Sequence, residues 1–295
     1  MQRKFSVYVL LITIVFFLFL SGCSYLFQTS DFWGTNSAQF LDKQVCSVFF
    51  LDVGQGDSIL IKTPENKFVL IDSGPNSAEQ DVLQTLDRLN VNKLNVVIAT
   101  HPHEDHIGNM DKIISKYDIE RFYTTNKTTN TQTFEDMLNA LKKKNLKISI
   151  VRPFDRLKLD GVTLTFLSPL KDYDDLNDSS VVVMLEFAGK RVLFTGDISK
   201  NVEYDVVRNV HDIKADVLKV SHHGSYTATS SLFLEKVNPK VAIISVGKDN
   251  PYGHPHSSTI RRLEKFKVKI FTTEQNGNIA ALIFPDGTLK LITQR

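Results

Sequence analysis

The alternation of hydrophobic and polar positions predicts strands and helices from about residue 43 to the end of the chain. Continuous apolar runs such as Asn95–Ala99, Val217–Val220 and Val241–Ser245 are typical of strands that are buried on both faces. Apolar residues spaced three and four apart predict helices, as in Ala78–Leu89 and Phe134–Lys144. The other expected strands are Val45–Leu51, Ser58–Lys62, Phe68–Ile71, Ile119–Tyr123, Ile148–Val151, Val162–Leu167, Val181–Phe187, Arg191–Phe194 and residues 268–272, 278–284 and 288–293. The other expected helices are Met110–Tyr117, Asn201–Val210, Ser231–Val237 and Thr259–Phe266. Two β-rich halves, each with helices, predict an α/β fold of the αββα type, in which two mixed β-sheets lie face to face with helices outside.

The first residues have a different pattern. Arg3 and Lys4 precede an apolar run, Phe5–Leu20, which is shorter than the roughly 20 residues of a membrane-spanning helix. The segment Leu20-Ser21-Gly22-Cys23 resembles the lipobox of bacterial lipoproteins. This resemblance implies that residues 1–22 are a signal peptide and that Cys23 carries lipid at the extracytoplasmic face of the cell membrane. An uncleaved signal anchor is the alternative.

Composition bounds the rest of the chain. Its 295 residues, 42% hydrophobic and 23% charged, exclude a mostly disordered or polytopic membrane protein. Residues 23–42 are expected to form a lipid-anchored tether, and residues 43–295 one domain. Without residues 1–22 the chain has 33 basic and 33 acidic side chains, so no overall positive charge attracts nucleic acid. Cys46, inside an apolar run, is expected to be a small buried residue.

Seven of the eight histidines fall into three clusters, and each cluster follows a predicted strand: residues 101–106, 222–223 and 254–256. Loops at strand ends are where α/β folds build their sites. In the first cluster, His101 and His103 are two residues apart, so both imidazoles lie on one side of an extended segment and can hold one ion. Asp105 and His106 can face a second ion. The pattern predicts a dinuclear metal centre.

The segment Thr100–His106 resembles the His-x-His-x-Asp-His motif of the metallo-β-lactamase superfamily, and the resemblance extends over residues 45–290. It implies that Asp72 supports the metal site from behind the ligands and that Asp197 bridges the two ions; for each, an ordinary turn-forming aspartate is the alternative. His222-His223 matches the last ligand motif. Because neighbouring side chains of an extended segment point to opposite faces, His222 is assigned to the metal and His223 to the substrate side.

One departure from the family pattern concerns the ligand set. Residues 169–180 contain no histidine, where the family usually has a third one. Either Asn177 or Asp178 must fill that place, or the place is vacant. Oxygen in place of imidazole favours harder ions such as Mn²⁺, so the expected cofactors are two divalent ions, zinc or manganese.

Four segments in order resemble the hydrolase domain of ComEC-type DNA-uptake channels, in a stand-alone form: Phe50–Ser58, Asn177–Ser180, His222–Ser225 and Asn250–Pro255. The resemblance implies a phosphodiesterase or nuclease in which two dications generate a hydroxide at neutral pH. Its substrate would be a phosphodiester, with DNA favoured. The alternatives are another hydrolase of the superfamily (a lactonase, a lactamase or an esterase of cell-wall phosphodiesters) and a non-catalytic metal-binding adaptor lipoprotein.

The resemblance implies a complete map of the site. The metal ligands are His101, His103, Asp105, His106, Asp178, Asp197 and His222. The catalytic residues are Asp105, His223 and His254, and the supporting residues are Asp57, Asp72, Asn177 and Ser225. Asp105 would orient the attacking hydroxide, and His223 and His254 would protonate the leaving oxygen or bind a phosphate oxygen. A hydrogen-bonded loop histidine is the alternative for His254, and a helix cap is the alternative for Ser225.

Overall fold

The computed structural model describes residues 27–29, 32, 34 and 37–295. The predicted signal peptide and Cys23 lie outside the described residues. Within the described part of the chain, no helix has the length and apolar character needed to cross a membrane.

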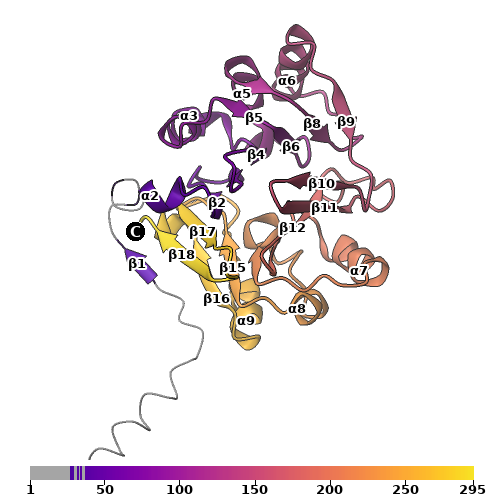
Figure 1. Cartoon of the computed structure of the whole chain (residues 1–295). Helices are drawn as coiled ribbons and strands as arrows, with labels where there is room; N and C mark the ends of the chain where they lie inside the picture. Colours follow the sequence, from indigo (N-terminus) through magenta and orange to yellow (C-terminus); the bar gives the residue numbers. More distant parts are fainter. Residues whose placement is uncertain (1–26, 30–31, 33, 35–36) are drawn as a thin grey trace, which may run out of the picture.

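Two large mixed sheets form the centre of the molecule (Figure 1). The nine-stranded sheet runs in the order β1 (Phe27–Thr29), β18 (Leu289–Thr293), β17 (Ile279–Ile283), β2 (Cys46–Phe50), β3 (Ile59–Lys62), β4 (Phe68–Ile71), β6 (Val96–Ala99), β8 (Phe122–Thr124) and β9 (Ile148–Ile150). The seven-stranded sheet runs β10 (Arg156–Leu159), β11 (Val162–Ser168), β12 (Val182–Phe187), β13 (Lys190–Phe194), β14 (Val217–Lys219), β15 (Val241–Ile244) and β16 (Lys269–Thr272). A small pair joins β5 (Lys93–Leu94) to β7 (Asp118–Ile119). Strands β4, β6, β8 and β9 are parallel in the first sheet, as are β13 to β16 in the second.

Helices cover the outer face of each sheet (Figure 1). Helices α3 (Glu79–Arg88), α5 (Met110–Lys116) and α6 (Gln132–Lys143) pack on the nine-stranded sheet, and α7 (Lys200–Asn209), α8 (Ser231–Val237) and α9 (Ser257–Lys265) pack on the other. The remaining short helices are α2 (Ser37–Phe40), α4 (Glu104–Ile107) and α10 (Thr273–Asn276), with 3₁₀ turns at Asn76–Ala78 and Ser221–Gly224. This αββα arrangement confirms the predicted fold class.

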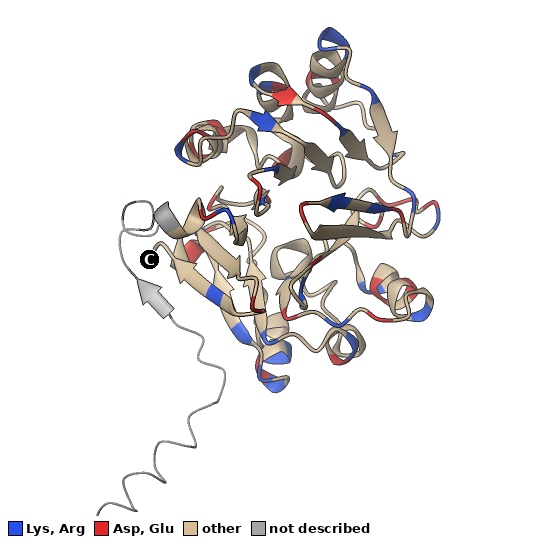
Figure 2. Ribbon diagram, viewed as in Figure 1, with Lys and Arg blue, Asp and Glu red and all other residues tan. Residues whose placement is uncertain are grey.

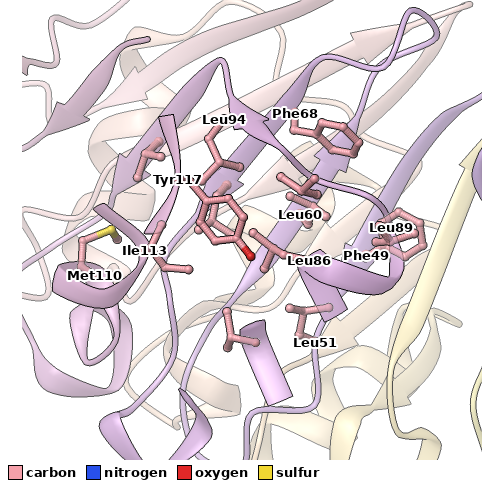
Figure 3. Close-up of a cluster of buried hydrophobic side chains, with 14 of the residues drawn as sticks. Phe49, Leu51, Leu60, Phe68, Leu86, Leu89, Leu94, Met110, Ile113 and Tyr117 are labelled. Carbon is pink, nitrogen blue, oxygen red and sulfur yellow. The ribbon is translucent and has the colours of Figure 1, made fainter. Parts of the chain in front are cut away.

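Three hydrophobic clusters hold the four layers together. Figure 3 shows part of the first, in which Leu60 of β3, Leu86 of α3 and Ile113 of α5 meet. The second fills the space between the sheets, where the rings of Phe50 and Phe194 lie 6.1 Å apart. Burying one such side chain contributes about 1.5–3 kcal/mol. Because a central strand contributes to two clusters at once, its residues are apolar without interruption, as the sequence indicated.

Some elements differ from expectation. The segment expected as one strand at Ile119–Tyr123 forms two, β7 and β8, and β10 was not expected, because its alternation of charged and apolar residues makes only a weak signal. Residues before 43 also contact the fold, because β1 pairs with β18 and the side chains of Phe32 and Phe40 are buried. Cys46 is buried as expected, and burial raises the pKa of its thiol to about 12.

Basic and acidic side chains are interspersed over the outer helices, which carry both colours in Figure 2. This distribution fits the equal numbers of basic and acidic residues after residue 22.

Candidate metal centre

The candidate site lies where strands of both sheets end. Strands β4 and β6 lead into Asp72 and the segment 100–106, and β13 and β14 lead into Asp197 and the segment 222–223. Hydrogen bonds between backbone groups join these loops. The amide of His222 donates to the carbonyl of Gly196 at 3.1 Å, and the amide of Val181 donates to Thr100 at 3.0 Å. The carboxyl ends of parallel strands therefore bring together residues that are far apart in the sequence.

Four side chains converge at this point: Asp105, His106, Asp197 and His223, whose ligand atoms lie within 4.8 Å of one another. The Nε2 atom of His223 lies 3.2 Å from Asp105 Oδ2 and 3.3 Å from Asp197 Oδ2, and His106 Nε2 lies 3.4 Å from Asp197 Oδ2.

Both Nε2 atoms and Asp197 Oδ1 are buried and have no hydrogen-bond partner among the described residues. Buried polar atoms are normally satisfied, so these unpaired atoms indicate a missing ligand. Two imidazoles and two carboxylates are a donor set that suits a divalent metal ion. The residues present therefore fit the metal that the sequence predicted.

The orientation of His106 is fixed from behind. Its Nδ1 atom lies 2.7 Å from Asp72 Oδ2, and the carboxylate of Asp72 also accepts hydrogen bonds from the amide and the hydroxyl of Thr100, both at 2.7 Å. A carboxylate bound to one imidazole nitrogen leaves the other nitrogen free to bind a metal. His223 is arranged in the same way, because its Nδ1 atom lies 2.9 Å from the carbonyl oxygen of Ser245.

His101 and His103 form a second potential ligand pair, as expected. His101 Nε2 lies 3.1 Å from His103 Nδ1, and the other nitrogen of His101 lies 3.2 Å from the hydroxyl of Ser180. Two imidazole nitrogens that face each other can share one ion.

The structure distinguishes the two candidates for the place of the absent histidine. Asn177 lines the same cavity as His103 and Asp197, and its Oδ1 atom is buried without a hydrogen-bond partner among the described residues. Asp178, which the sequence assigned as a ligand, instead accepts a hydrogen bond from the amide of Ser199 at the start of α7, at 2.9 Å. Geometry therefore favours Asn177.

The backbone conformation of His222 and His223 bears on which of the two is the metal ligand. Both residues have positive φ, 49° and 51°, so the segment is not extended and the two rings do not point to opposite faces. Both line the cavity, but His223 belongs to the four-residue group, whereas His222 Nε2 is 3.9 Å from Asp197 Oδ2. Consecutive non-glycine residues with positive φ are costly, and such strain is concentrated at functional sites. The geometry therefore favours His223 over His222 as a metal ligand, and the assignment stays a prediction.

A buried ion pair behind the histidines involves a residue that sequence reasoning missed. Lys219 is fully buried and forms an ion pair with Asp57, which is 2% exposed. Asp57 Oδ1 lies 3.7 Å from His223 Nδ1, and Asp57 Oδ2 lies 3.9 Å from His106 Nδ1. Asp57, which the sequence predicted as a supporting residue, thus lies beside the Nδ1 atoms of both histidines. The signal for Lys219 was a lysine inside the apolar run of β14, since a buried lysine needs a carboxylate partner.

The site opens into a cavity of about 460 Å³. Gln55, Tyr252 and His254 are among the residues that line it. The ring of His254 lies 5.6 Å from that of His222 and 6.3 Å from that of His223. The predicted site residue His254 is therefore beside the metal ligands.

The structure does not support the cap role that was considered for Ser225. The hydroxyl of Ser225 lies 2.9 Å from that of Thr227, Ser225 is not among the residues that line the cavity, and the cap of α8 is Ser230. The cap role offered for Ser225 thus belongs to Ser230, and the supporting role of Ser225 stays a prediction.

The charged groups inside the site shift one another's pKa values. Burial opposes a positive charge on His106 and His223, but the carboxylates of Asp197, Asp105 and their neighbours together outweigh it, so the pKa of His106 is raised well above its usual value and that of His223 to about 10. Burial opposes ionisation of Asp197, yet His223 and His106 hold its pKa well below the usual value. In the absence of metal, protons on the imidazoles therefore neutralise the carboxylates. His101 differs, because burial, followed by the nearby His106, lowers its pKa well below normal.

Comparison with known proteins agrees with this geometry. A family model described as "Metallo-beta-lactamase superfamily" matches residues 51–248. The chain is 33% identical over 250 residues to ComE operon protein 3 of Bacillus subtilis, an alignment that covers 79% of this chain and 32% of the relative. It is 31% identical over 252 residues to Recombination protein 2 of Haemophilus influenzae, which covers 83% of this chain and 30% of the relative. The chain thus spans about a third of the length of these relatives.

A solved structure of the metallo-beta-lactamase fold protein YhfI from Bacillus subtilis superposes with a TM-score of 0.52 and 14% identity, covering 78% of this chain and 96% of that one. At that identity the likeness shows the fold alone. The sequence relatives confirm the resemblance to ComEC-type domains. The individual ligand roles stay predictions.

Proposed function

This chain belongs to the metallo-beta-lactamase superfamily, and from that premise we propose that it is a metal-dependent phosphodiesterase that cleaves DNA outside the cytoplasmic membrane. One observation carries the proposal: the buried nitrogens of His106 and His223 and the carboxylates of Asp105 and Asp197 converge without filling one another's hydrogen-bonding capacity. Such a group of side chains can bind dications at the floor of an open cavity.

The residues would divide between two ions. One ion would be held by His101, His103 and Asn177, and the other by Asp105, His106 and His223, with Asp197 between them. When bound, the two ions would lower the pKa of a water molecule and neutralise charge on the attacking and leaving oxygens of a phosphodiester.

The surrounding side chains would orient the reactants. The carboxylate of Asp105, half-buried at the cavity floor, would accept a hydrogen bond from the attacking water. Burial, together with the neighbouring histidines, lowers the pKa of His254 to about 4, so its imidazole is neutral at pH 7. A neutral imidazole at the rim would donate a hydrogen bond to a phosphate oxygen rather than deliver a proton.

The choice of DNA rests on similarity and charge. The relatives named ComE operon protein 3 and Recombination protein 2 favour a DNA-related substrate. The interspersed charges of the outer helices (Figure 2) favour short or single-stranded material held at the site over a duplex held across a basic surface.

The activity can be tested with bis(p-nitrophenyl) phosphate, single-stranded DNA and a chromogenic β-lactam, each with Mn²⁺ or Zn²⁺. We expect cleavage of both phosphodiesters and little turnover of the β-lactam. Asp197→Asn, which keeps the shape of the side chain, should lower the rate by at least about 100-fold because it removes the shared charge. Asp118→Asn, an exposed position, is the matched control and should keep full activity. Efficient β-lactam turnover without phosphodiester cleavage would reject the proposal.

The location is a separate part of the proposal. The segment Leu20-Ser21-Gly22-Cys23 supports lipid attachment at Cys23. Cys23→Ala should abolish incorporation of a labelled fatty acid and release the chain from the membrane fraction, whereas Cys46→Ala should leave the label in place because Cys46 is buried in the domain. An unchanged lipid label in the Cys23 variant would refute the assignment.

A further inference from the structure

A tyrosine at the rim of the cavity has no role in the map described above. Tyr252 lies in the loop between β15 and α9, lines the cavity and is 63% exposed. An exposed tyrosine alone is ordinary, but a ring with an apolar face and a polar tip that lines a candidate active site is placed to contact a substrate.

The loop that carries Tyr252 is held rigidly by a single side chain. The amide nitrogen of Asn250 donates to the carbonyls of Gly247 (3.0 Å) and His254 (2.6 Å). Its amide oxygen accepts from the backbone of Tyr252 (3.2 Å) and of His254 (3.0 Å). These four bonds order the loop on both sides of Tyr252. The ring is therefore presented at a defined place although most of its surface faces solvent.

The ring of Tyr252 also stacks on that of His254, which lies next to the candidate metal centre. Its centroid lies 5.6 Å from that of His254, with 24° between the planes. His254 in turn contacts the rings of His222 and His223. Only the ring of His254 thus lies between Tyr252 and the residues expected to surround the reacting phosphate.

From this arrangement we infer that the exposed ring of Tyr252, backed by that of His254, forms a stacking subsite for the nucleobase next to the scissile phosphodiester. The inference rests on the proposed function, because it places a base only if the neighbouring site holds a phosphate. An aromatic face binds any base through its π-surface, so the subsite selects single-stranded nucleic acid over base-free phosphodiesters without selecting sequence. A paired base is already stacked within its duplex, so single strands are the preferred substrate.

The test compares two oligonucleotides of equal length and charge, oligo-dT and a fully abasic tetrahydrofuran oligomer. We expect the wild-type protein to have a kcat/KM for oligo-dT about tenfold above that for the abasic oligomer, and Tyr252→Ala to remove most of this difference. Tyr252→Phe should keep it, since the stacking ring remains. Tyr204→Ala, at a 50%-exposed tyrosine of α7 that does not line the cavity, is the matched control.

A binding readout separates the subsite from the chemistry. In the metal-free protein, fluorescence anisotropy with labelled forms of both oligomers should show that Tyr252→Ala weakens binding of oligo-dT and leaves the abasic oligomer unchanged.

Equal losses on both oligomers, or no loss on either, would overturn the inference and leave the phosphodiesterase proposal standing. If the wild-type protein cleaves neither oligomer nor bis(p-nitrophenyl) phosphate with any of the dications, the proposed function itself fails and the subsite falls with it.

Discussion

Replacing Lys219 by methionine tests how the buried ion pair supports the metal centre. Methionine has nearly the same length and keeps the packing of β14, but the substitution leaves the carboxylate of Asp57 buried at 2% exposure without its cation. Removing one partner of a buried pair costs roughly 3–5 kcal/mol. His106 and His223 lie 3.9 Å and 3.7 Å from Asp57 and supply part of the missing positive charge.

We therefore expect a loss at the lower end of that range, about 3 kcal/mol in the free energy of unfolding. In a domain of this size the loss corresponds to a decrease of about 6–12 °C in Tm. The assay is urea and thermal unfolding of the metal-free protein, so that metal binding does not contribute. Lys116→Met is the control, because Lys116 and Asp87 are an exposed pair, and an exposed pair contributes about 1 kcal/mol or less.

A double variant keeps the test decisive if Lys219→Met unfolds the protein. Asp57→Asn combined with Lys219→Met removes both charges, so it should recover most of the lost stability. A Lys219→Met protein as stable as the wild type would refute the reasoning, and so would a double variant less stable than the single one, since both results require that the buried charges are not coupled.

Three further predictions follow from the site. Asn177→Ala should lower the content of bound dications measured by mass spectrometry, while Asp178→Ala should keep it and cost about 1 kcal/mol of stability through the lost bond to α7; the reverse result would restore Asp178 as the ligand. Because the pKa of His223 is about 10 without metal, the imidazole is protonated at pH 7 and must lose its proton to bind an ion. Metal affinity should therefore increase with pH, and calorimetry in two buffers of different ionisation enthalpy should detect the released proton; identical heats in the two buffers would contradict this. Gly56→Ala should reduce both metal content and Tm, because a Cβ there would lie 2.3 Å from the carbonyl oxygen of Asp105, whereas Gly54→Ala, with nothing within 4 Å, should have the smaller effect.

The sequence by itself determined the layers and predicted most of the residues that gather at the candidate site. Runs such as Val96–Ala99 are buried on both faces, and only a strand at the centre of a covered sheet has that environment, so the pattern is readable without coordinates. The spacing of His101, His103 and His106 is equally local. Because these residues follow one buried strand directly, chain geometry alone keeps them together.

Tertiary structure alone decided the rest, and in each case the reason is a contact or a backbone angle that spacing does not encode. The orientation of His222 and His223 depends on two positive φ angles, so the rule of alternation along an extended strand does not apply to them. The choice between Asn177 and Asp178 depends on which side chain meets the start of α7. The pairing of Asp57 with Lys219 joins the loop before β3 to strand β14 of the other sheet, and a partner at that separation is fixed only when both sheets pack face to face and remove the two charges from water.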